Sequence, residues 1–323
     1  MTSPARPLVE SALLSALGAL FILVAFYVPV LGVFATLVSP LPVAFAVIRH
    51  GIRWGVLSSV VTLIVLLPFL SPITAISLWV VYGTMGVALG YSVRRGLAAE
   101  RTIGLMTGAS LVGMAADLLG AYLVTGITLR QLSDQTIKMF TEAYELNKRL
   151  VGETPVLEEI MKTVTPEMVM RMLPAGFFMS SLFLAWLNYE VVRRVFPRFG
   201  YTVHPLRPFS RWIMPELAGH AWILGIIAFQ LQPFYAERFS FLPIVVENVF
   251  LMAVMVLLID AASALCFFFR RSGISGGMAG FFTLIALYMA LTSPLIGLGA
   301  QIFGMIDVLF DLRKVRYPEL SDI

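Results

Sequence analysis

Two long stretches without a charged residue, 11–48 and 54–93, constrain the fold of this chain more than any other feature. A transmembrane helix needs about 20 consecutive apolar residues, so each stretch is long enough for more than one such helix. The composition agrees, since 59% of the 323 residues are hydrophobic and only 13% are charged. The sequence therefore predicts an all-α polytopic membrane protein and excludes an ordinary soluble domain.

Prolines, glycines and charge clusters divide the apolar sequence into about ten predicted segments. They are expected at 11–28, 30–48, 54–70, 73–93, 102–127, 171–190, 219–235, 244–269, 277–294 and 295–311. The first two segments are alternatively one helix followed by a re-entrant piece, and the last two are alternatively one kinked passage. The prediction is therefore a bundle of about 8 to 10 transmembrane helices.

Basic residues concentrate in every second loop of this scheme. They are Arg6; Arg49 and Arg53; Arg94, Arg95 and Arg101; Arg193, Arg194, Arg198, Arg207 and Arg211; Arg270 and Arg271; and Arg313, Lys314 and Arg316. Cytoplasmic loops are enriched in Lys and Arg, so both termini are expected in the cytoplasm and the protein in the inner (cytoplasmic) membrane. The net charge of +4 follows from this topology and does not indicate nucleic acid binding.

One membrane domain, 1–323, is expected, with an insertion at 128–170 that separates an N-terminal part, 1–127, from a C-terminal part, 171–323. The insertion is predicted outside the membrane. It is interpreted either as a lid or as a plain surface connection.

The insertion is expected to be helical. Its stretch 132–150 predicts an amphipathic helix on a protein or bilayer surface, because apolar residues recur at mostly helical spacing, namely Ile137, Phe140, Tyr144 and Leu150. A second short helix is expected after Thr154 and Pro155. Thr165 and Pro166 are expected to form the cap and first turn of the next span.

Three acidic residues lie inside predicted spans, namely Asp117, Glu247 and Asp260. Ionisable groups in a bilayer are costly unless they face a partner or a cavity. Asp117 and Asp260 are expected near mid-span with no Lys or Arg at matching depth, so they should be protonated or hydrogen-bonded. Glu247 and its neighbour Asn248 lie near the outer end of their span, about 140° around the helix from Asp260, so no shared pocket is expected. All four are candidates for ligand or ion binding, and structural hydrogen bonds between helices are the alternative.

Two further acids, Asp307 and Asp311, lie one helical turn apart near the cytoplasmic end of the last predicted span. Arg313 and Lys314 follow directly. Charge pairing of these acids with Arg313, Lys314 or basic residues of a neighbouring loop is therefore expected.

Small residues recur at four-residue spacing. The pairs are Ala12 and Ala16, Gly86 and Gly90, Gly104 and Gly108, and Gly276 and Gly280. Such pairs let helix backbones approach closely in lipid, and packing inside the protein is the general expectation. For Ala12 and Ala16, at the start of the chain, we expect a contact with another protein chain.

Sequence signatures of enzymes are missing. There is no Walker-type phosphate loop, no His or Cys cluster at metal-ligand spacing and no Gly-x-Gly-Asp motif. The stretch GISG at 273–276 contains Ser275, but no histidine follows it to serve as a general base. We therefore expect a protein that is not an enzyme, with no catalytic residue, metal or cofactor.

The basic passage VIRHGIRWGVLSSVVTLI (47–64) and the closing GMIDVLFDLRK (304–314) resemble the YybS-like family of uncharacterised bacterial membrane proteins. The N-terminal part is similar to the substrate-binding S components of energy-coupling factor transporters, which carry an Ala-x-x-x-Ala pair near the start of the first helix, here Ala12 and Ala16. This second resemblance implies that the pair packs against a coupling protein. The extra spans and the insertion depart from the S-component pattern.

Two classes of function remain. The first is a substrate-binding or transport subunit for an unidentified small molecule, with a cavity lined by some of the four candidate residues. The second is a structural or regulatory membrane scaffold that binds other cell-envelope proteins through its small-residue faces and basic loop 191–211. Both classes imply contact with the lipid bilayer, and neither involves nucleic acid.

Overall fold

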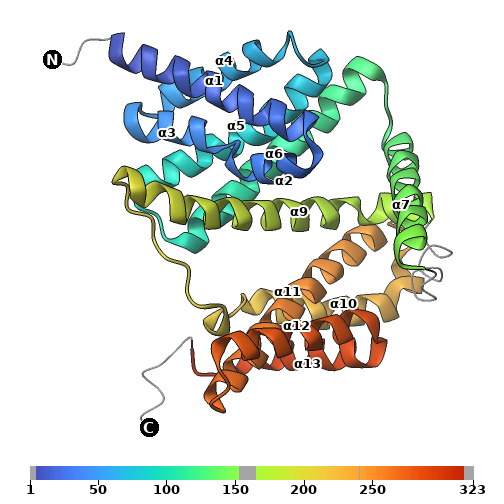
Figure 1. The fold of residues 1–323 in the computed structure, drawn as a ribbon. Helices are drawn as coiled ribbons and strands as arrows, with labels where there is room; N and C mark the ends of the chain where they lie inside the picture. The colour runs from blue at the N-terminus through green and yellow to red at the C-terminus, as the bar shows by residue number, and fades with distance from the viewer. Residues whose placement is uncertain (1–4, 153–164, 240, 316–323) are drawn as a thin grey trace. The chain divides into compact units, whose positions relative to one another are not determined.

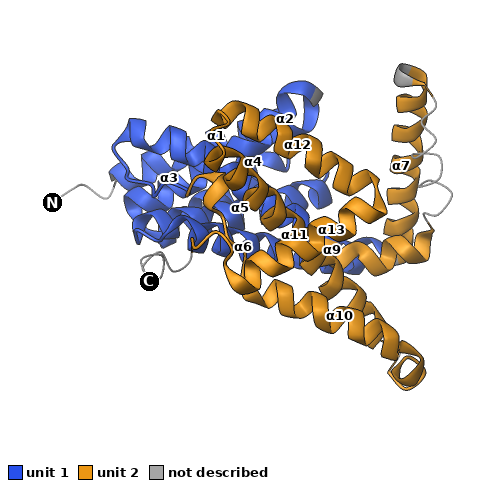
Figure 2. Cartoon of the chain, turned by 90° about the horizontal axis from the view of Figure 1, so that it is seen from below, with its two compact units in different colours: residues 1–128, 176–206 blue, residues 129–175, 207–323 orange. Residues whose placement is uncertain are grey.

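A computed structural model describes residues 5–152, 165–239 and 241–315. Every regular element in these residues is a helix, as predicted (Figure 1). The chain forms two compact units, one made of residues 1–128 and 176–206 and the other of residues 129–175 and 207–323 (Figure 2). The expectation of a single membrane domain stays a prediction.

Unit 1 contains six complete helices among its described residues. They are α1 (Ala5–Tyr27), α2 (Pro29–Val38), α3 (Leu41–His50), α4 (Ile52–Leu66), α5 (Pro72–Arg94) and α6 (Ala99–Thr125). The later part of α9 (Pro166–Val195) and the short 3-10 helix η1 (Phe196–Phe199) complete it. Its main core is built from large side chains such as Met85, Met106 and Tyr189.

Unit 2 begins with α7 (Leu129–Val151) and the first ten residues of α9, since the division falls after Ala175. Its other elements are η2 (Phe209–Arg211), α10 (Glu216–Tyr235), α11 (Leu242–Arg271), α12 (Gly276–Thr292) and α13 (Pro294–Phe310). The 30-residue helix α11 packs against α10, α12 and α13.

Local sequence explains where several helices begin and end. Pro72 and Pro166 open α5 and α9, where a missing backbone N–H is harmless. The hydroxyl of Ser71 accepts the N–H of Thr74 at 3.2 Å, and that of Thr165 accepts the N–H of Met168 at 3.2 Å. The predicted cap at Thr165 is therefore confirmed. The amphipathic helix predicted at 132–150 is also confirmed as α7, whereas the short helix expected after Thr154 lies outside the described residues.

The number of helices suited to spanning a membrane is at the lower end of the prediction. In the part of the chain that the structure describes, seven qualify by length and composition, or eight if the bent pair α12 and α13 is one broken span, so only the higher count reaches the predicted 8 to 10. The count of ten is too high for two reasons. The helix α4 has only 15 residues, and the axis turns by 118° between α12 and α13. The orientation of the termini stays a prediction. It was inferred by assigning successive loops to opposite sides of the membrane, and this assignment changes with the number of spans.

Only one of the three glycine pairs packs tightly inside the protein. A Cβ atom on Gly86 would lie 2.7 Å from the carbonyl oxygen of Pro40, and one on Gly90 would lie 2.6 Å from the Cβ of Val47. For the pairs Gly104/Gly108 and Gly276/Gly280, no described atom beyond the adjoining residues and the helix's own backbone lies within 4 Å of that position. Close approach of α3 and α5 therefore requires Gly86 and Gly90, and the other two pairs have room for larger side chains.

Hydroxyl groups form hydrogen bonds between α1 and α4. Ser15 donates to the carbonyl of Ser58 at 2.9 Å, and Thr62 donates to the carbonyl of Ser15 at 3.2 Å. The same helix leaves Ala12 and Ala16 exposed. The serines of α1 thus face the unit interior, while the predicted alanine pair lies on its outer side.

Candidate functional site

The four predicted binding residues divide among three places. Glu247 and Asn248 line a pocket in unit 2, Asp260 lies in a buried ion cluster of the same unit, and Asp117 lies in unit 1. Asp260 does not line the pocket, which confirms that it shares no site with Glu247. Asp117 is half-buried and accepts a hydrogen bond from the hydroxyl of Ser77. In the described residues, no group of three or more His, Cys, Asp and Glu side chains is placed to hold a metal ion.

The pocket in unit 2 has a volume of about 490 Å³, within the range of small-molecule sites. It is formed by the start of α9, the middle of α10 and the first half of α11. Its polar side chains are Thr165, Glu167, Arg171, Glu247 and Asn248, and its apolar ones are Met168, Met172, Phe229, Phe250 and Leu251. The pocket therefore has a charged wall and an apolar wall, and the apolar wall is made of aromatic rings and polarizable thioether groups.

The charged wall contains two carboxyl groups and one guanidinium. Arg171 donates to Glu247 at 3.2 Å, and the side chain of Glu247 is 28% exposed. Glu167 lines the same pocket, one helical turn before Arg171. Acidic groups thus outnumber basic ones around this space.

Asn248 forms structural hydrogen bonds between helices, which was the alternative to ligand binding expected from the sequence. Its side-chain oxygen accepts the N–H of Ala175 at 2.8 Å, and its nitrogen donates to the carbonyl of Arg171 at 2.7 Å. These two backbone groups flank Pro174, which has no N–H and weakens the α9 hydrogen-bond ladder. Asn248 is only 6% exposed and also donates to Ile244. It therefore holds α9 against α11 and keeps Arg171 beside Glu247.

A separate pocket of about 470 Å³ lies in unit 1, on α4, α5 and α6. Its lining is mostly apolar and includes Trp79, Val80 and Tyr91. The indole Nε1 of Trp79 is buried without a hydrogen-bond partner. This pocket suits an apolar molecule such as a lipid chain, and none of the four predicted binding residues lines it.

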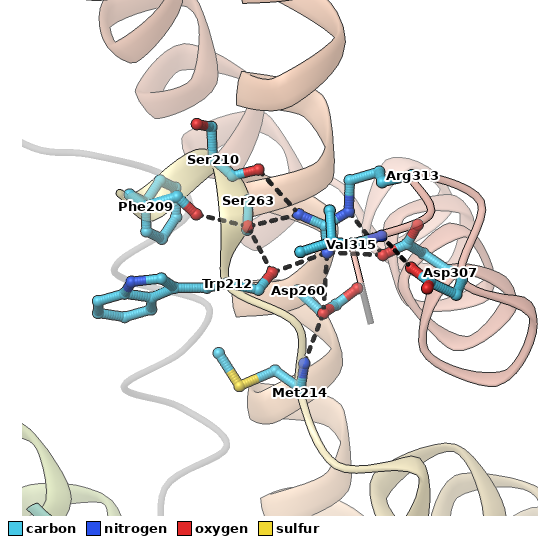
Figure 3. A network of polar contacts seen from close by, with 10 residues as sticks. Phe209, Ser210, Trp212, Met214, Asp260, Ser263, Asp307, Arg313 and Val315 are labelled. Carbon is cyan, nitrogen blue, oxygen red and sulfur yellow. Dashed lines mark hydrogen bonds and ion pairs between the residues drawn. The ribbon is translucent and has the colours of Figure 1, made fainter. Parts of the chain in front are cut away.

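The buried ion cluster of unit 2 is centred on Arg313 (Figure 3). Its guanidinium donates to Asp307 Oδ2 at 2.8 and 2.6 Å and to Asp260 Oδ1 at 3.3 Å. The other partners are the hydroxyl of Ser263 at 2.7 Å and the carbonyls of Ser210 and Trp212 at 3.2 and 2.8 Å. Arg313 thus joins α11, α13 and the loop that contains η2.

Asp260 is fully buried, and the backbone of the same loop completes its environment. The N–H of Met214 donates to Asp260 Oδ1 at 2.9 Å, and Ser263 bonds the carbonyls of Phe209 and Trp212 (Figure 3). The loop therefore lies along α11 and supplies polar partners that an apolar helix surface lacks.

The expectation that no basic residue would reach Asp260 is wrong. Arg313 follows the last predicted span, yet the chain reverses after α13, where Asp311 has a φ angle of 46°. This left-handed turn brings Arg313 back against α11. No local signal in the sequence marks this contact, because Asp260 and Arg313 are 53 residues apart.

The other expected pairings have mixed outcomes. Pairing of Asp307 with Arg313 is present, at 2.6 Å between Oδ2 and a terminal nitrogen. Asp311 accepts the N–H of Val315 at 2.9 Å, which stabilises the reversed turn, and its pairing with a basic residue stays a prediction. A contact of Ala12 and Ala16 with another chain stays a prediction, and so does an ion-binding or ligand-binding role for Asp117.

Comparison with known proteins identifies the family. The family model "Predicted membrane protein (DUF2232)" matches residues 16–308. The chain is 22% identical over 316 residues to the "Uncharacterized protein YybS" of Bacillus subtilis (strain 168), covering 96% of this chain and 98% of that protein. No solved structure matches significantly, and the similarity to S components stays a prediction. Because the family model covers most of both units, the chain belongs to the DUF2232 family of predicted membrane proteins.

Proposed function

We propose that this protein is a non-enzymatic substrate-binding subunit of a transport system in the inner membrane, and that its ligand occupies the pocket between α9, α10 and α11. One observation carries the proposal. The pocket brings Glu247, Asn248 and Arg171 together with an apolar wall in a volume of about 490 Å³. Small-molecule sites typically combine apolar walls with a few placed polar groups in this way.

The charged side chains of the pocket favour a positively charged ligand. Two carboxyl groups, Glu167 and Glu247, line the pocket beside one guanidinium, so a positively charged group is preferred. The rings of Phe229 and Phe250 lie 5.1 Å apart, edge to face, and aromatic faces attract organic cations. The proposed ligand is therefore a small organic cation with an apolar body.

A binding experiment with matched probes tests this proposal. Phenethylammonium should bind the purified protein more tightly than 3-phenylpropionate, which has a similar body and the opposite charge. Glu167→Gln should weaken binding of the cation by about fivefold, since one charge at contact distance contributes about 1 kcal/mol in water. Glu237→Gln, in the same unit but outside the pocket, is the control and should leave the dissociation constant unchanged.

Equal binding of both probes, or loss of binding only in the control, would exclude the charge-based selectivity. Native mass spectrometry of gently purified protein offers an independent check. A retained organic cation that disappears in Glu167→Gln supports the assignment. A retained protein partner without a small molecule favours the scaffold function instead.

A membrane scaffold is the second candidate, and the exposed position of Ala12 and Ala16 on α1 supports it. Ala16→Leu should then weaken self-association or co-purification of a partner, measured by cross-linking, without lowering the melting temperature. Ala19→Leu provides the contrast, because Ala19 is only 1% exposed and a larger side chain there should destabilise the monomer. If Ala16→Leu destabilises the monomer in the same way, the pair serves ordinary internal packing.

A further inference from the structure

The cluster around Arg313 has an imbalance of charge and of hydrogen-bonding groups. Two carboxyl groups, Asp260 and Asp307, face one guanidinium, and all three side chains are 0% exposed. Asp260 Oδ2 and Asp307 Oδ1 are buried and have no hydrogen-bond partner among the described residues. Buried polar atoms are normally paired, because an unpaired one loses its water without compensation.

The two carboxyl groups are neighbours, because Asp260 Oδ1 and Asp307 Oδ2 contact the same terminal nitrogen of Arg313, at 3.3 and 2.6 Å. Carboxylate oxygens only accept hydrogen bonds, whereas a protonated carboxyl group also donates one. A single proton would therefore convert two unpaired acceptors into one hydrogen bond between Asp260 and Asp307. It would also leave one negative charge opposite the one positive charge of Arg313.

We infer that Asp260 and Asp307 form a proton-binding site that holds one shared proton beside Arg313. The inference is independent of the pocket and of its proposed ligand. A proton fits better than a metal cation, because the guanidinium already lies against one oxygen of each carboxyl group and would repel a second cation. In the described residues, the charged groups that face Asp260 are Arg313, in direct contact, and Asp307 of α13, on the same guanidinium. Farther along α11, Arg270 bonds the hydroxyl of Ser210 at 3.3 Å.

The shared proton predicts how stability depends on pH. The folded protein retains the proton while the unfolded chain releases it above the ordinary range of an aspartic acid. The folded state then binds one proton more, so stability falls as pH rises. The unfolding constant of the parent should rise about tenfold per pH unit relative to a variant that lacks the shared proton.

Asp260→Asn is the matched variant. Its side-chain oxygen can still accept from Met214 and Arg313, while its NH₂ group replaces the proton as donor to Asp307. Full-length parent and variant in detergent should be unfolded with dodecyl sulfate at several values between about pH 5 and pH 9, with tryptophan fluorescence as the readout. The ratio of their unfolding constants should change about tenfold per pH unit. Asp307→Asn should remove the same dependence.

Asp311→Asn is the control, because Asp311 accepts the backbone N–H of Val315 and an asparagine side chain can accept it in the same way. It should retain the parent's pH dependence. The double variant Asp260→Asn/Asp307→Asn removes both charges opposite Arg313 and should be far less stable than either single variant. A ratio of unfolding constants that is independent of pH would overturn the inference, and so would stability of the parent that depends on sodium or potassium at fixed pH.

Infrared spectroscopy keeps the inference testable if the variants fail to fold. The parent at neutral pH should show the carbonyl stretch of a protonated carboxylic acid, with the downshift on transfer to heavy water that marks an exchangeable proton. A spectrum with carboxylate bands only would show that both acids are ionised.

Discussion

Replacing Arg313 with Met is expected to lower the free energy of unfolding by about 3 to 5 kcal/mol, because removal of one partner from a buried ion cluster leaves uncompensated charge behind. The substitution leaves Asp260 and Asp307 without their cation and the carbonyls of Ser210 and Trp212 without a donor. Unfolding of the purified protein in dodecyl sulfate measures the loss directly.

Lys314→Met is the matched control, since it removes a neighbouring positive charge that is exposed. Its effect should be within about 0.5 kcal/mol. Arg313→Lys should fall between the two, because an ammonium keeps the charge but cannot reproduce the planar fork that contacts several acceptors. Equal stability of Arg313→Met and the parent would show that the cluster does not hold unit 2 together.

Gly304→Ala is expected to destabilise the protein by about 1 to 3 kcal/mol through overpacking. A Cβ on Gly304 would lie 2.2 Å from the carbonyl oxygen of Leu257 and 3.3 Å from the nitrogen of Ala261. Both are backbone atoms of α11, so α13 would have to move away as a whole. Asp307 follows on the same helix, so this movement should also disturb the ion cluster.

Gly299→Ala supplies the control on the same helix, because nothing lies within 4 Å of the corresponding position. Ala is a better helix former than Gly by up to about 1 kcal/mol, so this variant should be as stable as the parent or slightly more stable. The argument from close helix contact fails if Gly304→Ala and Gly299→Ala have the same melting temperature.

Features that depend on neighbouring residues in the chain were predictable. Long uncharged runs identify the helical membrane class, because a bilayer has no water to satisfy irregular backbone. The cap at Thr165 and the amphipathic helix α7 follow from local spacing in the same way. The buried small residues Ala261 and Ala262 leave room for another helix beside α11, and Gly304 of α13 approaches its backbone there.

Contacts between residues that are far apart in the sequence were not predictable. Residues 260 and 313 are far apart in the sequence, and their contact requires the left-handed turn at Asp311. The hydrogen bonds of Asn248 to the α9 backbone depend on Pro174, which lies next to Ala175 on that other helix. Similarly, Gly86/Gly90 and Gly104/Gly108 have the same spacing, yet only the first pair faces another helix closely. Composition and periodicity thus define the membrane helices because they act within each segment, whereas pairing of buried charges arises only when the segments pack.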